Sequence, residues 1–308
     1  MKRSIIAAAA LAGLLLAACG DDKEATAATE APTTDAPTTD APTTDPAAGG
    51  DAAACAEGKT LEAGALVIAT GDPAYPPYVL DDDPTSGEGF ESALALAVAA
   101  EMGFEGDAVS WVRTSFDSAV AGDDSNFDFN LQQFTINDER KEVVSFSAPY
   151  YTANQAVLGA IDGPASTITS MADLKGLKLG AASGTTSLQY ILDVIQPDAE
   201  PFVFSSNADA ATALGNGQID VIISDLPTAI FWAAAGSEFG GIDNTKVYGQ
   251  FPLGAEGGDQ WGLLLVKDNP LVECVDLALA SLAASGELDT ITTEWMADFA
   301  EAPLLPES

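Results

Sequence analysis

The sequence predicts an α/β fold with two lobes. Short apolar stretches typical of strands alternate with segments in which apolar residues recur at helical spacing. Such alternation is typical of a largely parallel sheet that is covered by helices on both faces. The pattern occurs twice between residues 55 and 308, and a chain of 308 residues is long enough for two buried cores.

The first series of elements begins at residue 66. Residues 66–69 form a short apolar strand, followed by a turn rich in Pro, Tyr and Gly. The next apolar residues recur at i, i+4, i+7 and i+8, which places them on one face of a helix: Phe90, Leu94, Ala97 and Val98. Residues 108–112 and 127–134 read as two further strands.

The second series begins near residue 177. It contains a strand at 177–182, a helix from about Ser187, a helix at 209–214 and a strand at 219–224. Two more helical stripes follow near the end of the chain, one of Leu271, Val275, Leu279 and Leu282 and one of Ile291, Trp295 and Phe299. The repeat of the α/β pattern predicts the second lobe.

The first twenty residues read as an export signal. Lys2 and Arg3 precede a nearly unbroken apolar run at 5–18, which is shorter than the roughly 20 residues that a membrane span needs. The run ends in Leu16-Ala17-Ala18-Cys19-Gly20, which resembles a bacterial lipobox. The resemblance implies removal of residues 1–18, lipidation of Cys19 and tethering to the outer face of the cytoplasmic membrane. An ordinary signal peptide with an incidental cysteine is the alternative.

Residues 19–54 are predicted to form a disordered tether between the lipid and the folded region. The segment is rich in Ala, Thr, Pro and Asp, and the sequence Ala-Pro-Thr-Thr-Asp occurs at 31–35, 36–40 and 41–45. Because residues 19–54 contain no aromatic residue and no apolar periodicity, this segment cannot bury enough surface to become ordered.

The charge composition excludes several functions. The chain has 47 Asp and Glu against 11 Lys and Arg, and its formal net charge is -36. Such a chain repels nucleic acid and anionic lipid headgroups. The absence of histidine removes Ser-His and Cys-His nucleophiles and the commonest zinc sites. The Asp81-Asp82-Asp83 run lacks calcium-loop spacing, so no metal or other cofactor is expected.

An ordered set of motifs resembles the polar amino-acid family of bacterial solute-binding proteins. The matching segments are 70–78 (TGDPAYPPY), 89–91 (GFE), 135–140 (TINDER), 146–151 (FSAPYY), 173–176 (DLKG), 180–186 (GAASGTT), 217–220 (GQID) and 224–225 (SD), with Gly286 and Trp295. The resemblance implies a type II periplasmic-binding-protein fold, with two lobes joined by two crossover strands. Lobe 1 is expected at 55–157 plus 261–308, and lobe 2 at 158–260.

The resemblance also implies a function. It predicts a monomer that is not an enzyme and that captures a free amino acid, polar and neutral or cationic, for an ABC permease and ATPase. Two alternatives stay open: a cyclohexadienyl or arogenate dehydratase on the same fold, and a sensor subunit of a membrane receptor. A dehydratase needs a general acid in the cleft and no ammonium clamp.

The site residues follow from the charged ends of a free amino acid. Arg140 falls at the family's carboxylate-binding position, and its guanidinium can hold both oxygens. Thr185 and Thr186 begin a helix whose amides can bind the same carboxylate, or they only cap it. Asp225 ends an apolar strand and by resemblance pairs with the ammonium; a helix cap is the alternative.

Six more residues are expected around the ligand, most of them from the resemblance. Gln133 and Thr135 offer a carbonyl and a hydroxyl to the ammonium, although Gln133 departs from the small residue often found there. Tyr75 and Phe116 flank the ligand side chain, and Phe134 adjoins them; ordinary core packing is the alternative for these rings. Asp72 either meets a cationic side chain or caps its own loop.

Cys55 and Cys274 remain after Cys19 is lipidated. Two cysteines in an exported protein favour a disulfide, which would join the start of the folded region to the helix near 271–284. Two free buried thiols are the alternative.

Overall fold

The computed structural model describes residues 51–251 and 258–307. The predicted signal, Cys19 and most of the predicted tether lie outside these residues. The last part of the predicted tether is helical: α1 (Ala52–Ala56) begins at Asp51, whose carboxylate accepts a hydrogen bond from the amide of Ala54 at 3.1 Å. No helix in the described part of the chain is both long and apolar enough to cross a membrane.

The first sheet has the strand order β2-β1-β3-β10-β4. Strands β1 (Leu66–Gly71), β2 (Val109–Thr114) and β3 (Phe129–Asn130) are parallel, whereas β10 (Asp259–Val266) runs antiparallel to both β3 and β4 (Val144–Ala153). The first sheet therefore combines four strands from the first half of the chain with one strand, β10, from near its end.

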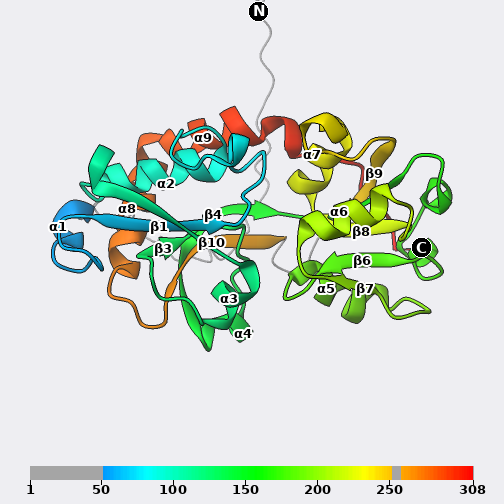
Figure 1. Ribbon diagram of the computed structural model, residues 1–308, viewed down its shortest axis with the longest axis horizontal. Coiled ribbons are helices and arrows are strands. Elements are labelled where there is room, and N and C mark those ends of the chain that lie inside the picture. Colours follow the sequence, from blue (N-terminus) through cyan, green and yellow to red (C-terminus); the bar gives the residue numbers. More distant parts are fainter. Residues whose placement is uncertain (1–50, 252–257, 308) are drawn as a thin grey trace, which may run out of the picture. The chain divides into compact units, whose positions relative to one another are not determined.

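Helices cover both faces of this sheet. Successive residues of β1 point to opposite faces, and both sets are apolar and pack against helices. Leu66 and Ile68 pack in a core with helices α2 (Phe90–Glu101), α8 (Val272–Ser285) and α9 (Glu287–Met296). Val67 and Ala69 pack instead with α3 (Phe116–Ala121). Figure 1 shows α2 and α9 on one side of this sheet and α3 with α4 (Asp138–Lys141) on the other.

The predicted strand at 127–134 is shortened to the two residues of β3. Gln133 has a φ of +52°, a left-handed conformation that ends extended backbone. The chain therefore turns out of the sheet at the point where it enters the cleft described below.

The second sheet has the order β7-β6-β8-β5-β9. Strands β6 (Leu179–Ala182), β7 (Phe202–Phe204) and β8 (Val221–Asp225) are parallel, and β5 (Gln155–Ala160) runs antiparallel to β8 and β9 (Thr245–Phe251). Its apolar clusters include residues of α6 (Asn207–Gly215) and α7 (Leu226–Ala235) on one face, and of the segment after α5 (Thr186–Tyr190) on the other.

The chain passes between the sheets twice. Asn154 separates β4 from β5, and the chain is back in the first sheet at the start of β10, after leaving the second sheet at the end of β9. The predicted lobe boundaries, after residues 157 and 260, therefore fall inside β5 and β10. The end of the chain also differs from the prediction: Leu304 pairs with Gln250 of β9, and Leu305 packs in a core of the second sheet.

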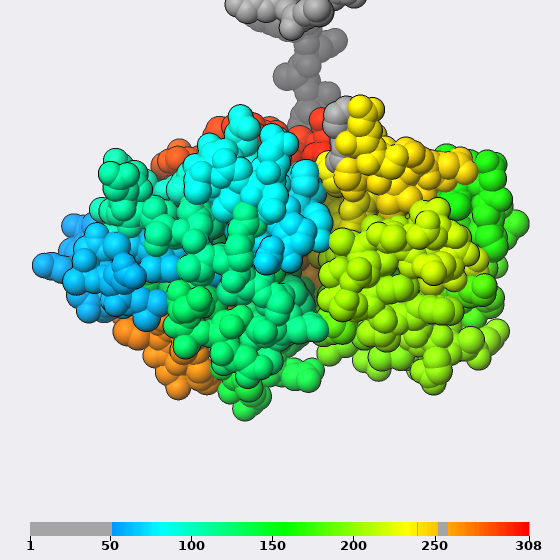
Figure 2. Space-filling view, viewed as in Figure 1, coloured from blue at the N-terminus to red at the C-terminus, as the bar shows by residue number. Residues whose placement is uncertain are grey.

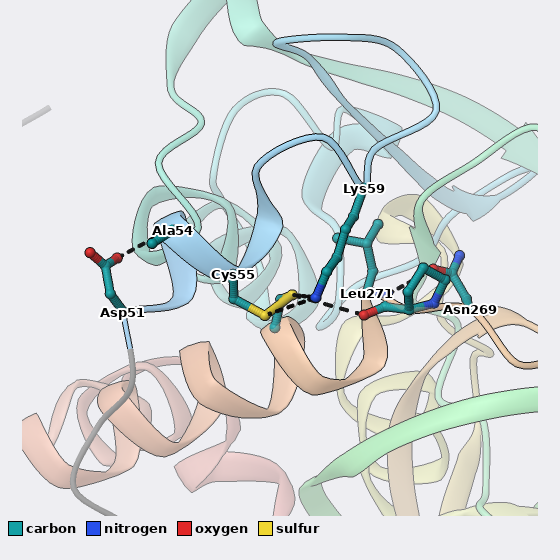
Figure 3. The surroundings of a disulfide bond; sticks show 8 residues. Asp51, Ala54, Cys55, Lys59, Asn269 and Leu271 are labelled. Carbon is teal, nitrogen blue, oxygen red and sulfur yellow. Dashed lines mark hydrogen bonds between the residues drawn. A yellow bond between two sulfur atoms is a disulfide. The ribbon is translucent and has the colours of Figure 1, made fainter.

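A disulfide joins Cys55 of α1 to Cys274 of α8, which confirms the predicted pairing. Figure 3 shows the bond between the two helices, with the Lys59 ammonium beside it at 3.4 Å and 3.3 Å from the two sulfur atoms. The disulfide therefore ties the start of the folded region to a helix that packs on the first sheet.

Candidate functional site

A cleft with about 1020 Å³ of empty space, part of it open to solvent, is lined by residues of both sheets. Nine of the ten predicted ligand-binding residues line it: Asp72, Tyr75, Phe116, Gln133, Thr135, Arg140, Thr185, Thr186 and Asp225. Phe134 does not. Its ring is fully buried and stacks on the ring of Phe116 at a centroid distance of 5.2 Å, so it supports the cleft wall from behind.

Arg140 provides the positive charge of the cleft. It lies on α4, which begins at Asn137, whose side chain accepts a hydrogen bond from the Arg140 amide at 2.8 Å. The side chain is buried, and its guanidinium donates to the carbonyl oxygens of Thr135 (2.7 Å) and Gly184 (2.9 Å) while lying over the Phe116 ring. Burial lowers the pKa of Arg140, an effect that Asp259 and Asp225 oppose.

The two threonines at the start of α5 have different roles. The hydroxyl of Thr185 accepts a hydrogen bond from the amide of Leu188 at 3.2 Å, so this residue caps the helix as well as lining the cleft. The hydroxyl of Thr186 donates to Asp259 at 2.8 Å and lies 3.4 Å from the hydroxyl of Thr135 across the cleft. Thr186 therefore connects the wall of the cleft to the carboxylate of Asp259.

Asp225, at the end of β8, is the centre of a partly buried acidic group. The side-chain nitrogen of Gln155 donates to Asp225 at 2.5 Å and to Asp259 at 2.9 Å. The hydroxyl of Ser187 donates to the carbonyl oxygen of the same amide at 2.6 Å. Burial, and then repulsion from Asp259, hold the pKa of Asp225 well above its ordinary value. Burial also raises the pKa of Asp259.

A second buried carboxylate shapes the turn at Gln133. Glu91 of α2 is 1 % exposed and accepts hydrogen bonds from the Gln133 amide (2.8 Å), the Gln133 side chain (2.5 Å) and the Tyr150 hydroxyl. Burial raises the pKa of Glu91 to about 7, although these three bonds favour the ionised form. The side-chain nitrogen of Gln133 donates to Glu91. Only a carbonyl oxygen of Gln133 can accept from an ammonium, because an amide nitrogen is a donor.

Other residues that line the cleft are aromatic or acidic. Tyr75 is partly buried, and burial raises its pKa with contributions from Asp209, Asp82 and Asp72. Asp72 is exposed at the cleft wall, and Asp117 accepts a hydrogen bond from Ser183 at 2.7 Å.

Arg113 fixes the loop that carries Asp72 and Tyr75. Its guanidinium binds the carboxylate of Asp82 at 2.6 Å and the carbonyl of Gly71 at 2.7 Å. Arg113 lies in no matching motif, so the sequence predicts a surface position for it, and the structure gives it a supporting role.

In addition to the contacts of Thr186 and Gln155 described above, side chains link the two lobes at four more places. Besides the Arg140–Gly184 and Ser183–Asp117 contacts, the hydroxyls of Tyr78 and Thr228 are 2.8 Å apart. Gln189 donates to Glu139 at 3.2 Å. In the space-filling view, the surface of the first lobe (blue to green) directly meets that of the second (light green to yellow) (Figure 2).

Sequence reasoning missed Gln155, Ser187, Asp259 and Glu91 as parts of the site. Gln155 and Asp259 are the first residues of the strands that follow the two crossovers. Their proximity to Asp225 depends on pairing between distant strands, so no local motif reports it. Glu91 lies within a matched motif, and an acid at the first turn of an apolar helix was the available signal.

A cleft between two α/β lobes, lined by the guanidinium of Arg140 and by carboxylates, defines a two-lobed binding protein of the type II periplasmic fold. The chain belongs to the bacterial extracellular solute-binding proteins, family 3, whose family model matches residues 66–298. The fold and the family predicted from the motifs are thereby confirmed.

Curated relatives bind several amino acids. The chain is 28 % identical to the ABC transporter arginine-binding protein 1 of Escherichia coli over 72 % of this chain and 86 % of the relative. It is 28 % identical to the L-cystine-binding protein TcyJ of Escherichia coli (77 % and 84 % covered). It is 30 % identical to the glutamine-binding protein GlnH of Bacillus subtilis (70 % and 75 % covered).

Solved structures show the same fold. An ancestral arginine-binding protein bound to arginine is 29 % identical and has a TM-score of 0.62, with 75 % of this chain and 98 % of that chain covered. An ancestral amino acid-binding protein described as a precursor of cyclohexadienyl dehydratase is 30 % identical and has a TM-score of 0.61, with 75 % and 95 % covered.

Proposed function

We propose that the chain is a lipid-tethered binding protein that captures a polar amino acid, with a cationic side chain preferred, and delivers it to an ABC importer. The observation that carries the proposal is that a guanidinium and a carboxylate line the same cleft. Arg140 comes from the first lobe and Asp225 from the second.

In this proposal each charged end of the ligand has a partner. Arg140 and the backbone near Thr186 bind the carboxylate, because a buried guanidinium can form two parallel hydrogen bonds to it. Asp225 binds the ammonium together with the carbonyl of Gln133 and the hydroxyl of Thr135. Because residues of both lobes contribute, a ligand that bridges them favours the closed arrangement.

The charges of the cleft favour a cationic side chain. Among the described residues that line the cleft, Arg140 is the only cationic one, whereas Asp72, Glu91, Asp117 and Asp225 are acidic. Once Arg140 binds the α-carboxylate, a ligand with a second carboxylate has no cation left to pair with. Several curated relatives are named for arginine, which supports the same choice.

A thermal-shift screen of the twenty amino acids tests this function. We expect L-arginine and L-lysine to raise the melting temperature by roughly 5–10 °C at 100 times the dissociation constant, and L-glutamate and L-aspartate to leave it unchanged. Agmatine, which is arginine without its carboxylate, is the matched control and should give no comparable shift. A screen in which no amino acid raises the melting temperature would refute the proposal.

A dehydratase is the second candidate, and the neighbour described as a precursor of cyclohexadienyl dehydratase is the observation that favours it. Such an enzyme needs a general acid that reaches the substrate. Glu91 has a raised pKa, but both of its oxygens accept hydrogen bonds from Gln133 or Tyr150. Incubation with prephenate or arogenate separates the two functions, because only the enzyme yields an aromatic product.

The proposed tether depends on Cys19. We expect Cys19→Ala to release the protein from the membrane, because removal of the lipidated sulfur removes the attachment point. Fractionation of cells that express each form measures this, and Cys19→Ser serves as a second variant. Recovery of the alanine form in the membrane pellet would contradict the lipid anchor while leaving amino-acid binding untouched.

A further inference from the structure

One side-chain amide in the cleft serves two carboxylates. The nitrogen of Gln155 donates to Asp225 at 2.5 Å and to Asp259 at 2.9 Å. A carboxyl group accepts from an amide N–H whether it is ionised or shares a proton with its neighbour, so the nitrogen of this amide can donate to both acids. The oxygen of the amide accepts from the Ser187 hydroxyl at 2.6 Å, which is consistent with that orientation. Gln155 is fully buried, so the two acids are held beside each other at the base of the cleft by an amide in the protein interior.

The backbone places this pair where the two lobes meet. Asp225 ends β8 opposite Gln155 in the register of the second sheet, and Asp259 begins β10 of the first sheet opposite Ala153. Asp259 is 8 % exposed and accepts from the hydroxyl of Thr186 at 2.8 Å. The cleft-lining carboxylate of Asp225 therefore has a second carboxylate directly behind it.

The surroundings supply little positive charge to stabilise both acids in the ionised form. Arg140 is the cation that lowers the pKa of both carboxylates. The other titratable groups that face them are Glu91, Tyr78 and Tyr150, which are acids themselves. Burial raises the pKa of each aspartate, and repulsion from Asp259 raises that of Asp225 further. Such a pair loses its two protons in separate steps. The last proton is held to a higher pH, because its loss leaves two negative charges side by side.

We propose that Asp259 is a further positioning residue of the ammonium site, and that the Asp225–Asp259 pair shares one proton in the unliganded cleft and releases it to solvent when the ligand ammonium binds. This inference rests on the proposed function. In the exchange one carboxyl O–H bond breaks, its proton passes to buffer, and an ammonium N–H donates to Asp225 in its place. The pair then carries two negative charges beside the ammonium and Arg140.

The sign of the pH dependence follows from linkage. The liganded protein holds fewer protons than the free protein, so affinity rises with pH while the free pair is protonated. We expect the dissociation constant for L-arginine to fall by up to tenfold per pH unit from acidic pH upward, and to level off once the free pair has lost its proton.

Titration calorimetry with L-arginine, in buffers of different ionisation enthalpy, measures the proton released on binding. We expect up to one proton for the parent protein and none for Asp259→Asn, which keeps the shape of the side chain but cannot share the proton. We also expect the affinity of Asp259→Asn to be nearly independent of pH, so that it exceeds the parent at low pH. Asp117→Asn, which removes another carboxylate of the same cleft, should retain the proton release.

Three results separate this inference from its alternatives. If the parent binds L-arginine without releasing a proton, the shared proton is wrong and the proposed function stands. If Asp259→Asn still releases the proton and Glu91→Gln does not, Glu91 is the source and the inference is again wrong. If Asp225→Asn binds L-arginine as the parent does, the ammonium site itself is misplaced. The proton count of the parent needs no variant, so it decides the matter even if Asp259→Asn does not fold.

Discussion

Arg140→Ala is expected to weaken amino-acid binding by about two to four decades. A cleft that closes on a carboxylate removes water from it, and an unpaired charge in a buried site is costly. Arg140 is 7 % exposed, and its guanidinium is already held by the carbonyls of Thr135 and Gly184, so it is oriented before the ligand arrives. Loss of one partner of a buried pair costs roughly 3–5 kcal/mol, which corresponds to this change in affinity.

Two further variants sharpen the test of Arg140. Arg140→Lys should recover only part of the affinity, because an ammonium cannot form two parallel hydrogen bonds to a carboxylate. Lys141→Ala is the matched control: it removes a positive charge from the same helix, where the exposed side chain forms only a 3.5 Å contact with Asp138. Calorimetry with the best ligand measures all three. An Arg140→Ala protein that is folded and binds within tenfold of the parent would show that the carboxylate lies elsewhere.

Removal of the Cys55–Cys274 disulfide is expected to lower the free energy of unfolding by up to about 5 kcal/mol. The two cysteines are 219 residues apart in sequence, so the bond closes almost the whole folded region into a loop. In the chain-entropy model, a loop of this size greatly restricts the unfolded chain, although measured values often fall below the model. Denaturant unfolding of the parent and of the Cys55→Ser/Cys274→Ser variant gives the difference.

The same variant separates stability from binding. Neither cysteine lines the cleft, so the ligand affinity of the folded double variant should stay within about twofold of the parent. Reductant should destabilise the parent and leave the double variant unchanged, which controls for effects of serine itself. Equal unfolding free energies for oxidised and reduced parent protein would contradict a stabilising role for the bond.

Local sequence determined most elements and the principal site residues. Apolar periodicity is a short-range signal, so β1, α2, β6 and α8 could be located from it. Arg140, Thr185, Thr186 and Asp225 each lie within a motif of a few residues at the end of a strand or the start of a helix. Such positions come together at one edge of an α/β sheet whatever the details of packing.

Only the tertiary structure decided which groups stand behind these residues. Gln155 and Asp259 begin the two strands that follow the crossovers. They meet Asp225 because β5 pairs with β8 in the second sheet while β10 enters the first sheet beside it. The buried position of Phe134 and the return of the chain end to β9 likewise depend on contacts between distant segments. A sequence pattern records the preference of each segment for strand or helix. The burial that raises the pKa of Asp225 exists only after both lobes are assembled around it.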